Sequence, residues 1–217
     1  MLKSVSAISP LFMVVLILIL YEISYFISVN TLFVPEISSH HSLLNHDETQ
    51  FASVMSYLER ISNWGYFIIP VIIMIKLTMV TFFIQLPFLL NSLIITYKKY
   101  FKIIVYASLF LAIGECIRVL RISFIESHQT NWSKSQFLPF GIIDLVNVDF
   151  YEPTFLVILN YFNIFELGWF FVVYFGLKKI AGINKQDALI AVTSVWILII
   201  LINWGFAYCF YQMATVT

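Results

Sequence analysis

Five long apolar runs, separated by polar connections, organise this chain. They cover residues 10–33, 65–90, 101–124, 154–177 and 188–211. Each run reaches the roughly 20 residues that a helix needs to cross about 30 Å of hydrocarbon. Each is also continuously apolar, whereas a membrane β-strand alternates apolar and polar residues over about ten positions. We therefore predict an all-α, polytopic membrane protein in which residues 1–217 form a single bundle of five transmembrane helices.

Composition agrees with a membrane location and narrows the class of partner. The 217 residues are 61% hydrophobic and 11% charged, with a mean hydropathy of +0.92, far from the balance of a soluble domain. Twelve basic and twelve acidic residues cancel, so no electrostatic footprint for nucleic acid exists. The two cysteines lie in apolar runs and form no disulfide framework. The expected partners are membrane lipids and other integral membrane proteins.

Charge placement in the connections predicts the orientation. Basic residues in short loops stay on the cytoplasmic side of a membrane. The second and fourth connections are rich in lysine, whereas the first and third are mainly acidic. This pattern predicts a cytoplasmic N-terminus and a C-terminus outside. The lysines concerned are Lys98, Lys99, Lys102, Lys178, Lys179 and Lys185.

The outer connections are too long for simple turns. Residues Gln50 to Phe67 carry apolar side chains at three- and four-residue spacings, which is typical of an amphipathic helix lying on the membrane interface before span two. The same pattern also fits an extension of span two itself into the aqueous phase. Residues Leu138 to Pro153 mix apolar and acidic side chains, and they fit a short re-entrant or interfacial cap.

Six ionisable residues fall within the predicted spans, where each costs about 2.5 to 3.5 kcal/mol near the bilayer centre on insertion scales. Three of them, all in the third run, are spaced three residues apart, so they project from nearly one helical face. That face must look into the bundle or towards water. The predicted intramembrane polar network is Glu22, Lys76, Glu115, Arg118, Arg121 and Glu166.

Two interpretations of this network stay open. Because acids and bases balance, it fits a neutral set of pairs that fixes how the helices pack. The alternative is a polar cavity for an ion, a proton or a lipid headgroup, because arginine offers planar donors that suit phosphate. We expect Glu166 to pair with Arg118. Arg121 either joins the network or reaches the outer interface alone.

A histidine-rich segment in the first connection offers candidate metal ligands: His40, His41, His46 and Asp47. Imidazole and carboxylate together can bind zinc or another divalent metal. The spacing matches no HExxH helix, and no cysteine set supports it, so a solvated polar loop explains these residues better. We therefore predict no cofactor.

Several enzyme signatures are missing from the sequence, including GxSxG, the P-loop and GxGxxG. We therefore predict that the chain is not an enzyme. A membrane enzyme that uses the outer histidines without a recognisable motif stays as a third hypothesis.

Two stretches carry a resemblance to a known family. They are YKKYFKIIVYASLFLAIGE, beginning at Tyr97, and FNIFELGWFFVVYFGLKKIAGINKQDALIAVTSVWIL, beginning at Phe162. In both, the chain resembles the Yip family of five-span membrane proteins, although it lacks that family's acidic-Leu-Tyr-Gly-Pro element. The resemblance implies a five-span plan with the N-terminus inside. It also implies a non-enzymatic factor that organises membranes, with some bacterial relatives accompanying ABC exporters.

These observations lead to two functional hypotheses of different classes. The first is an accessory or scaffold subunit that packs beside a larger complex, such as an ABC exporter or a secretion machine, in the bacterial cytoplasmic (inner) membrane. The second is a small transporter or lipid-handling protein that uses the intramembrane Glu/Arg site. The second hypothesis requires a cavity that reaches the buried charges.

Overall fold

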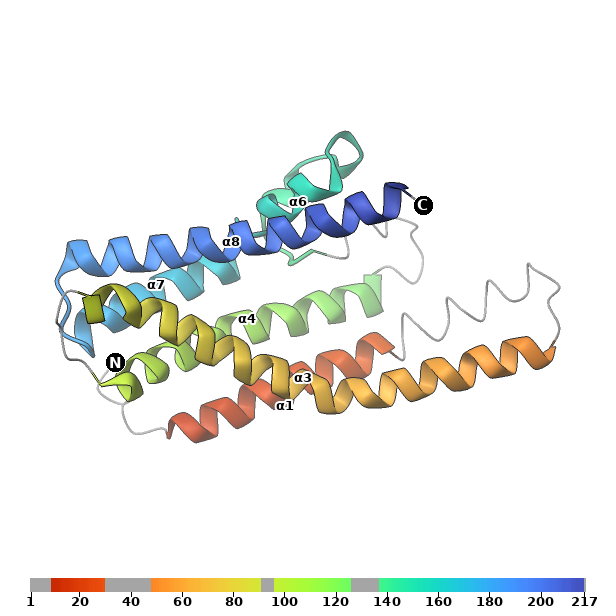
Figure 1. Cartoon of the computed structure of the whole chain (residues 1–217), viewed down its shortest axis with the longest axis horizontal. Coiled ribbons are helices and arrows are strands. Elements are labelled where there is room, and N and C mark those ends of the chain that lie inside the picture. The colour runs from red at the N-terminus through yellow and green to blue at the C-terminus, as the bar shows by residue number, and fades with distance from the viewer. Residues whose placement is uncertain (1–8, 30–47, 91–95, 126–136, 217) are drawn as a thin grey trace.

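The computed structural model describes residues 9–29, 48–90, 96–125 and 137–216, and it is helical almost throughout (Figure 1). Four of its helices are long and apolar enough to cross a membrane. This confirms an all-α protein with several candidate spans. The helices are α1 (Pro10–Ser28), α3 (Glu48–Leu90), α4 (Tyr97–Ile125), η4 (Ile142–Leu145), η5 (Val148–Phe150), α6 (Pro153–Asn160), α7 (Ile164–Lys179) and α8 (Lys185–Val216).

The fourth predicted run, 154–177, is two helices and not one. α6 begins at Pro153, whose fixed φ suits a first helical position, and it ends at Asn160. α7 begins at Ile164 and has 16 residues, fewer than the roughly 20 that a span requires. Within the part of the chain that the structure describes, there are therefore four helices of spanning length where the sequence predicted five.

Asn163 causes this break. Its side-chain oxygen accepts hydrogen bonds from the backbone N–H groups of Phe165 and Glu166, at 2.8 and 2.9 Å, which caps the start of α7. Its amide nitrogen donates back to the carbonyl oxygen of Asn160 at the end of α6. The Asn163 side chain is therefore fully used at a buried corner, and the residue is only 1% exposed.

The segment Gln50 to Phe67 is not a separate interfacial helix, because α3 runs without interruption from Glu48 to Leu90. Of the two interpretations of this segment, the extension of span two is the correct one. Figure 1 shows α3 projecting beyond the other helices and changing direction part of the way along. Pro70 lies inside the helix and explains the bend, since proline removes a backbone hydrogen bond and its ring crowds the preceding turn.

α4 is the central helix of the bundle, with contacts to α1, α3 and α7. Its first half is deeply buried: Tyr100, Ile103, Ile104, Val105 and Ala107 are each at most 1% exposed. Figure 1 shows the starts of α1, α4 and α8 at the same end of the bundle as the ends of α3 and α7. The two lysine-rich connections are therefore on one side.

α4 and α7 approach closely because glycines accept large side chains from the opposite helix. Gly168 of α7 lies against Phe110 of α4, and Gly176 of α7 lies against Ile103 of α4. Gly114 of α4 makes the reciprocal contact with a ring on α7. A Cβ atom at any of the three would lie within 2.7 Å of an atom of the opposite side chain. We call this contact the glycine interface.

Candidate functional site

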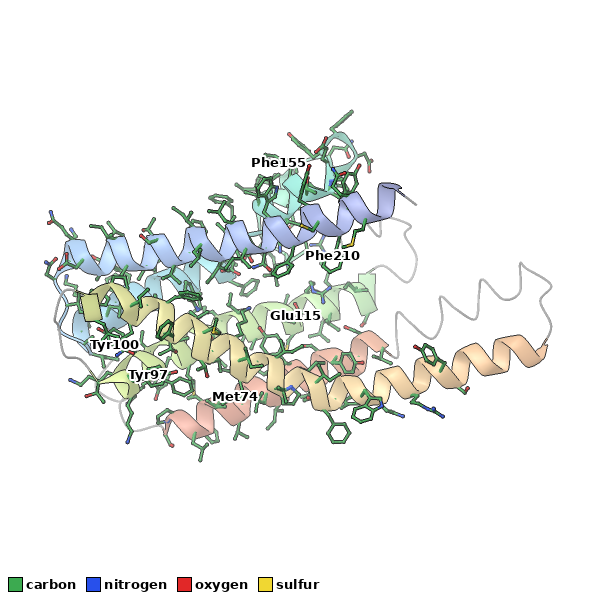
Figure 2. All side chains as sticks on the ribbon, in the orientation of Figure 1. Met74, Tyr97, Tyr100, Glu115, Phe155 and Phe210 are labelled. Atoms are coloured by element: carbon green, nitrogen blue, oxygen red, sulfur yellow. The ribbon has the colours of Figure 1, made fainter. Side chains whose placement is uncertain are left out.

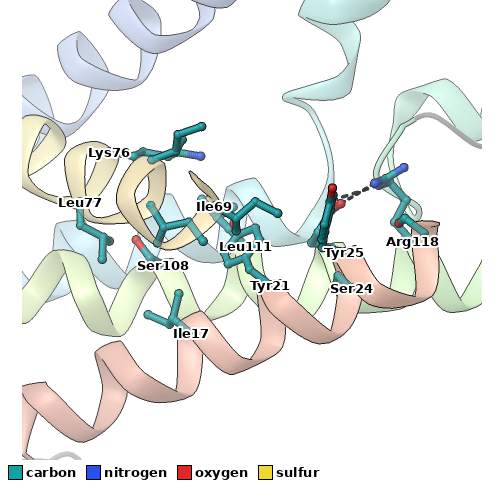
Figure 3. A pocket seen from close by; sticks show the side chains of 14 residues that line it. Ile17, Tyr21, Ser24, Tyr25, Ile69, Lys76, Leu77, Ser108, Leu111 and Arg118 are labelled. Carbon is teal, nitrogen blue, oxygen red and sulfur yellow. Dashed lines mark hydrogen bonds and ion pairs between the residues drawn. The ribbon is translucent and has the colours of Figure 1, made fainter. Parts of the chain in front are cut away.

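A cavity of about 420 Å³ lies between α1, α3 and α4 (Figure 3). Its walls are mostly apolar, and its polar lining comes from all three helices. Figure 2 shows Glu115 within the bundle, and Figure 3 shows Lys76 and Arg118 at different ends of the cavity. The polar and charged side chains that line it are Tyr21, Ser24, Tyr25, Ser28, Lys76, Ser108, Glu115 and Arg118.

Hydrogen bonds fix the α1 wall of this cavity. The Ser24 hydroxyl donates to the carbonyl oxygen of Leu20 at 2.9 Å and also lies 3.2 Å from the sulfur of Cys116 on α4. The Tyr25 hydroxyl donates to the carbonyl oxygen of Ser62 at 3.1 Å. The Tyr25 ring lies directly against Gly65, where no Cβ would fit. The wall is therefore held to both α3 and α4.

Arg118 pairs with Glu115 on its own helix. The Nε atom of Arg118 donates to Oε2 of Glu115 at 3.0 Å, and a second guanidinium nitrogen contacts Oε1. This two-point pair cancels both charges at one end of the cavity. The predicted pair between Glu166 and Arg118 is absent from the ion pairs of the described residues, because the carboxylate three residues away takes the guanidinium instead.

Lys76 lies between the larger cavity and a second, smaller one. The second cavity holds about 30 Å³, roughly the volume of one water molecule. Glu166 of α7 and Tyr161, just after α6, line this smaller cavity together with Lys76 and Ser108. Lys76 makes no ion pair within 4.0 Å among the described residues, whereas both arginines in the network do.

Arg121, another member of the predicted network, forms an ion pair near the end of α4, away from both cavities. Its guanidinium donates to Asp144 of η4 at 2.8 Å, which ties the end of α4 to the segment before α6. The second oxygen of Asp144 accepts from the N–H groups of Phe140 and Gly141, at 2.6 and 3.3 Å. Partial burial works to raise the pKa of Asp144, but these hydrogen bonds and the Arg121 charge outweigh it and lower that pKa.

Glu22 does not line either cavity. Its Oε1 atom is buried and has no hydrogen-bond partner among the described residues. The structure thus divides the six predicted network residues: three line the large cavity, one lines only the small cavity, and two lie elsewhere. The candidate metal ligands His40, His41, His46 and Asp47 lie outside the described residues. Within the described ranges, no three His, Cys, Asp or Glu side chains gather closely enough for a metal ion.

Asp144 and Tyr161 are the residues that sequence reasoning missed. The partner of Arg121 could have been sought among the acids of the following connection, because that arginine lies near the outer end of its run. Tyr161 is one of many aromatic residues in the fourth run, and nothing in its spacing separates it from a packing residue. Its place at the cavity follows only from the break between α6 and α7.

The four long apolar helices suggest a multi-pass membrane protein, and its bundle contains a mostly apolar, partly open cavity with a few polar and charged side chains. No family model, no curated protein and no solved structure matches this chain.

Proposed function

We propose that this chain is a small membrane carrier that binds an organic anion in the cavity between α1, α3 and α4. One observation carries the proposal: Lys76, an exposed residue in the middle of the apolar stretch of α3, lines a mostly apolar cavity and makes no ion pair among the described residues. A cation at this depth costs about 2.5 to 3.5 kcal/mol on insertion scales unless something offsets it. Glu166 in the smaller cavity acts on Lys76 only from beyond 4.0 Å, and an anion bound in the larger cavity would offset the charge by direct contact.

The ligand class follows from the lining of the cavity. Because Glu115 and Arg118 neutralise each other, Lys76 leaves the larger cavity with one net positive charge. The remaining walls are mainly isoleucine and leucine side chains, with two tyrosines and three serines. A volume of about 420 Å³ lies within the range of small-molecule sites. The ligand that fits is therefore a small molecule with one negative charge and an apolar body.

The depth of the cavity agrees with a carrier. On α4 the lining runs from Ser108 to Arg118, which spans about 15 Å at 1.5 Å per residue. It therefore extends from the middle of α4 towards the end opposite the lysine-rich connections. Transporters commonly bind their substrates near the bilayer midplane. With the lysine-rich end in the cytoplasm, the cavity belongs to the outer half of the membrane.

Calorimetry on the purified protein tests this proposal. We would reconstitute the full chain in nanodiscs of neutral phosphatidylcholine and titrate octanesulfonate, which stays anionic at every pH used, with empty nanodiscs as the blank. Lys76→Met should weaken binding by about 10- to 100-fold, the value of a charge-assisted hydrogen bond. Lys98→Met removes an exposed lysine outside the cavity and should leave binding unchanged.

A second ligand sharpens the result. Octanamide has a similar apolar body and no charge, so it should bind wild-type protein weakly. Its affinity should change little in Lys76→Met. If Lys76→Met binds octanesulfonate as tightly as wild-type protein does, the proposed anion site is wrong.

An accessory role in a larger membrane complex is a second candidate, favoured by the outer half of α8. Large apolar side chains there are exposed. Phe210, seen in Figure 2, is 65% exposed, and Phe206 and Met213 are similarly open. Under this second proposal, the chain is a non-enzymatic subunit in the bacterial inner membrane and has the five-span plan of the Yip family. Purification in mild detergent tests it, because a stoichiometric membrane partner that survives a salt wash is expected.

A further inference from the structure

Two cavities on either side of one lysine suggest how the carrier is energised. The larger and the smaller cavity share four lining residues, Lys76, Leu77, Ser108 and Leu111. Lys76 is the one charged residue in this shared wall. The larger cavity is the proposed anion site, and the smaller one contains Glu166. A single ammonium group can therefore serve either of two anions.

Few charged or titratable groups face Glu166, and they come from each neighbouring helix. Lys76 faces it from α3 and the Trp196 side chain from α8. Tyr161 approaches from the turn after α6, and Tyr21 approaches from α1. On α4, the carboxylate and the guanidinium that line the larger cavity are already paired with each other. Lys76 is thus the cation on which a charged Glu166 depends.

We propose that binding of the anion is coupled to protonation of Glu166, because Lys76 can neutralise only one of the two. In the empty protein, the ammonium charge stabilises the Glu166 carboxylate from beyond ion-pair distance. A bound anion takes over that charge, and it leaves Glu166 as an uncompensated carboxylate in a cavity with room for about one water. Glu166 then takes one proton from the solvent onto a carboxylate oxygen. This inference rests on the proposed function.

The coupling makes the loading step electrically neutral, since one negative charge and one proton are bound together. Linkage requires the effect to be reciprocal: if the anion favours proton binding, protons must favour anion binding by the same factor. The affinity for the anion should therefore fall as pH rises, by at most about tenfold per pH unit for one linked proton. A proton gradient directed inwards would then drive uptake of the anion.

The test measures proton uptake on addition of octanesulfonate. Titrations in two buffers of different ionisation enthalpy give the number of protons bound per ligand, and we expect up to about one in wild-type protein. Glu166→Gln should bind octanesulfonate without proton uptake and with no dependence on pH. Asp149→Asn removes an exposed carboxylate distant from both cavities, so it should behave as wild-type protein does.

A second measurement needs no change at Glu166, in case that variant does not fold. Infrared difference spectra of wild-type protein should show a new carboxylic-acid C=O band when octanesulfonate binds, and Asp149→Asn should keep that band. Absence of octanesulfonate binding in wild-type protein would overturn the proposed function. Binding without proton uptake, or uptake that persists in Glu166→Gln, would overturn the coupling alone and leave the anion site intact.

Discussion

The two sides of α4 differ in how they use space. Towards α7, glycines let the two helices meet so closely that a methyl group would not fit at Gly114, Gly168 or Gly176. Towards α1 and α3, the same helix borders an open volume of about 420 Å³. Protein interiors are normally packed as densely as organic crystals. Because one side of α4 is packed this closely, the cavity on its other side results from the side chains at that site and does not reflect poor packing of the whole bundle. The glycine interface gives the cavity one fixed wall.

The comparison can be tested with one enlargement made on each side of α4. Gly114→Leu should destabilise the protein by about 3 kcal/mol, because the new side chain overlaps the Phe165 ring. Ser108→Leu should change stability by no more than about 1 kcal/mol, because Ser108 borders both cavities. Thermal unfolding in mild detergent, followed by tryptophan fluorescence, would measure both.

Gly205→Leu is the matched control, since nothing lies within 4 Å of a Cβ at Gly205 on α8. It should be tolerated. Equal losses of stability for the substitutions at Gly114 and Gly205 would show that glycine is needed in the helices generally and would remove the distinction between the two sides of α4. Ser108→Leu should additionally weaken octanesulfonate binding, because the added atoms occupy the cavity.

The corner that positions α7 should respond less strongly. Asn163→Ala removes the cap of α7 and leaves buried N–H groups unsatisfied, which should cost about 2 kcal/mol. Asn147 also accepts a backbone hydrogen bond, at the start of η5, but it is exposed. Asn147→Ala should therefore cost only about 0.5 kcal/mol in the same unfolding assay. Similar costs at both sites would mean that the α6 to α7 corner does not depend on its buried asparagine.

The smallest effect is expected at the Arg121 to Asp144 pair, because both side chains are 27% exposed. The folded state lowers the pKa of Asp144, so its stabilising contribution is present above the unfolded pKa of about 3.9 and is lost as pH falls through the folded value. Asp144→Asn should lower the unfolding temperature slightly at pH 7, and the difference from wild-type protein should shrink below about pH 4. Asp149→Asn should show no such convergence.

The sequence predicted the helical class and most helix positions correctly, because hydrophobic length in a membrane is a strong constraint. It missed the break at Tyr161 to Asn163, since hydropathy averaged over about 20 residues passes over a single asparagine. Local chemistry carried the signal: Asn163 stands three residues before Glu166, a spacing typical of a helix start. The prediction of a separate interfacial helix was wrong for a related reason, because amphipathic spacing alone does not show where a helix ends.

The site was only partly accessible from sequence. Helical spacing placed Glu115 and Arg118 on one face, and they do line the cavity together. Their mutual pairing was not chosen, because depth in the membrane suggested a partner on another helix. The cavity itself could not be foreseen, since it depends on how α1 and α3 lean on α4. The position of Lys76 between two cavities follows from that packing and not from any motif.

In mechanical terms, α3 is a bent lever. From Pro70 back to Glu48, the helix extends about 33 Å at 1.5 Å per residue, and its tip stands clear of the other helices (Figure 1). On the other side of the bend, the next two turns of the same helix form the wall that carries Lys76. A force applied at the tip would therefore act on that wall with the leverage of the long arm, and a tilt of a few degrees at Pro70 would move the tip by ångströms.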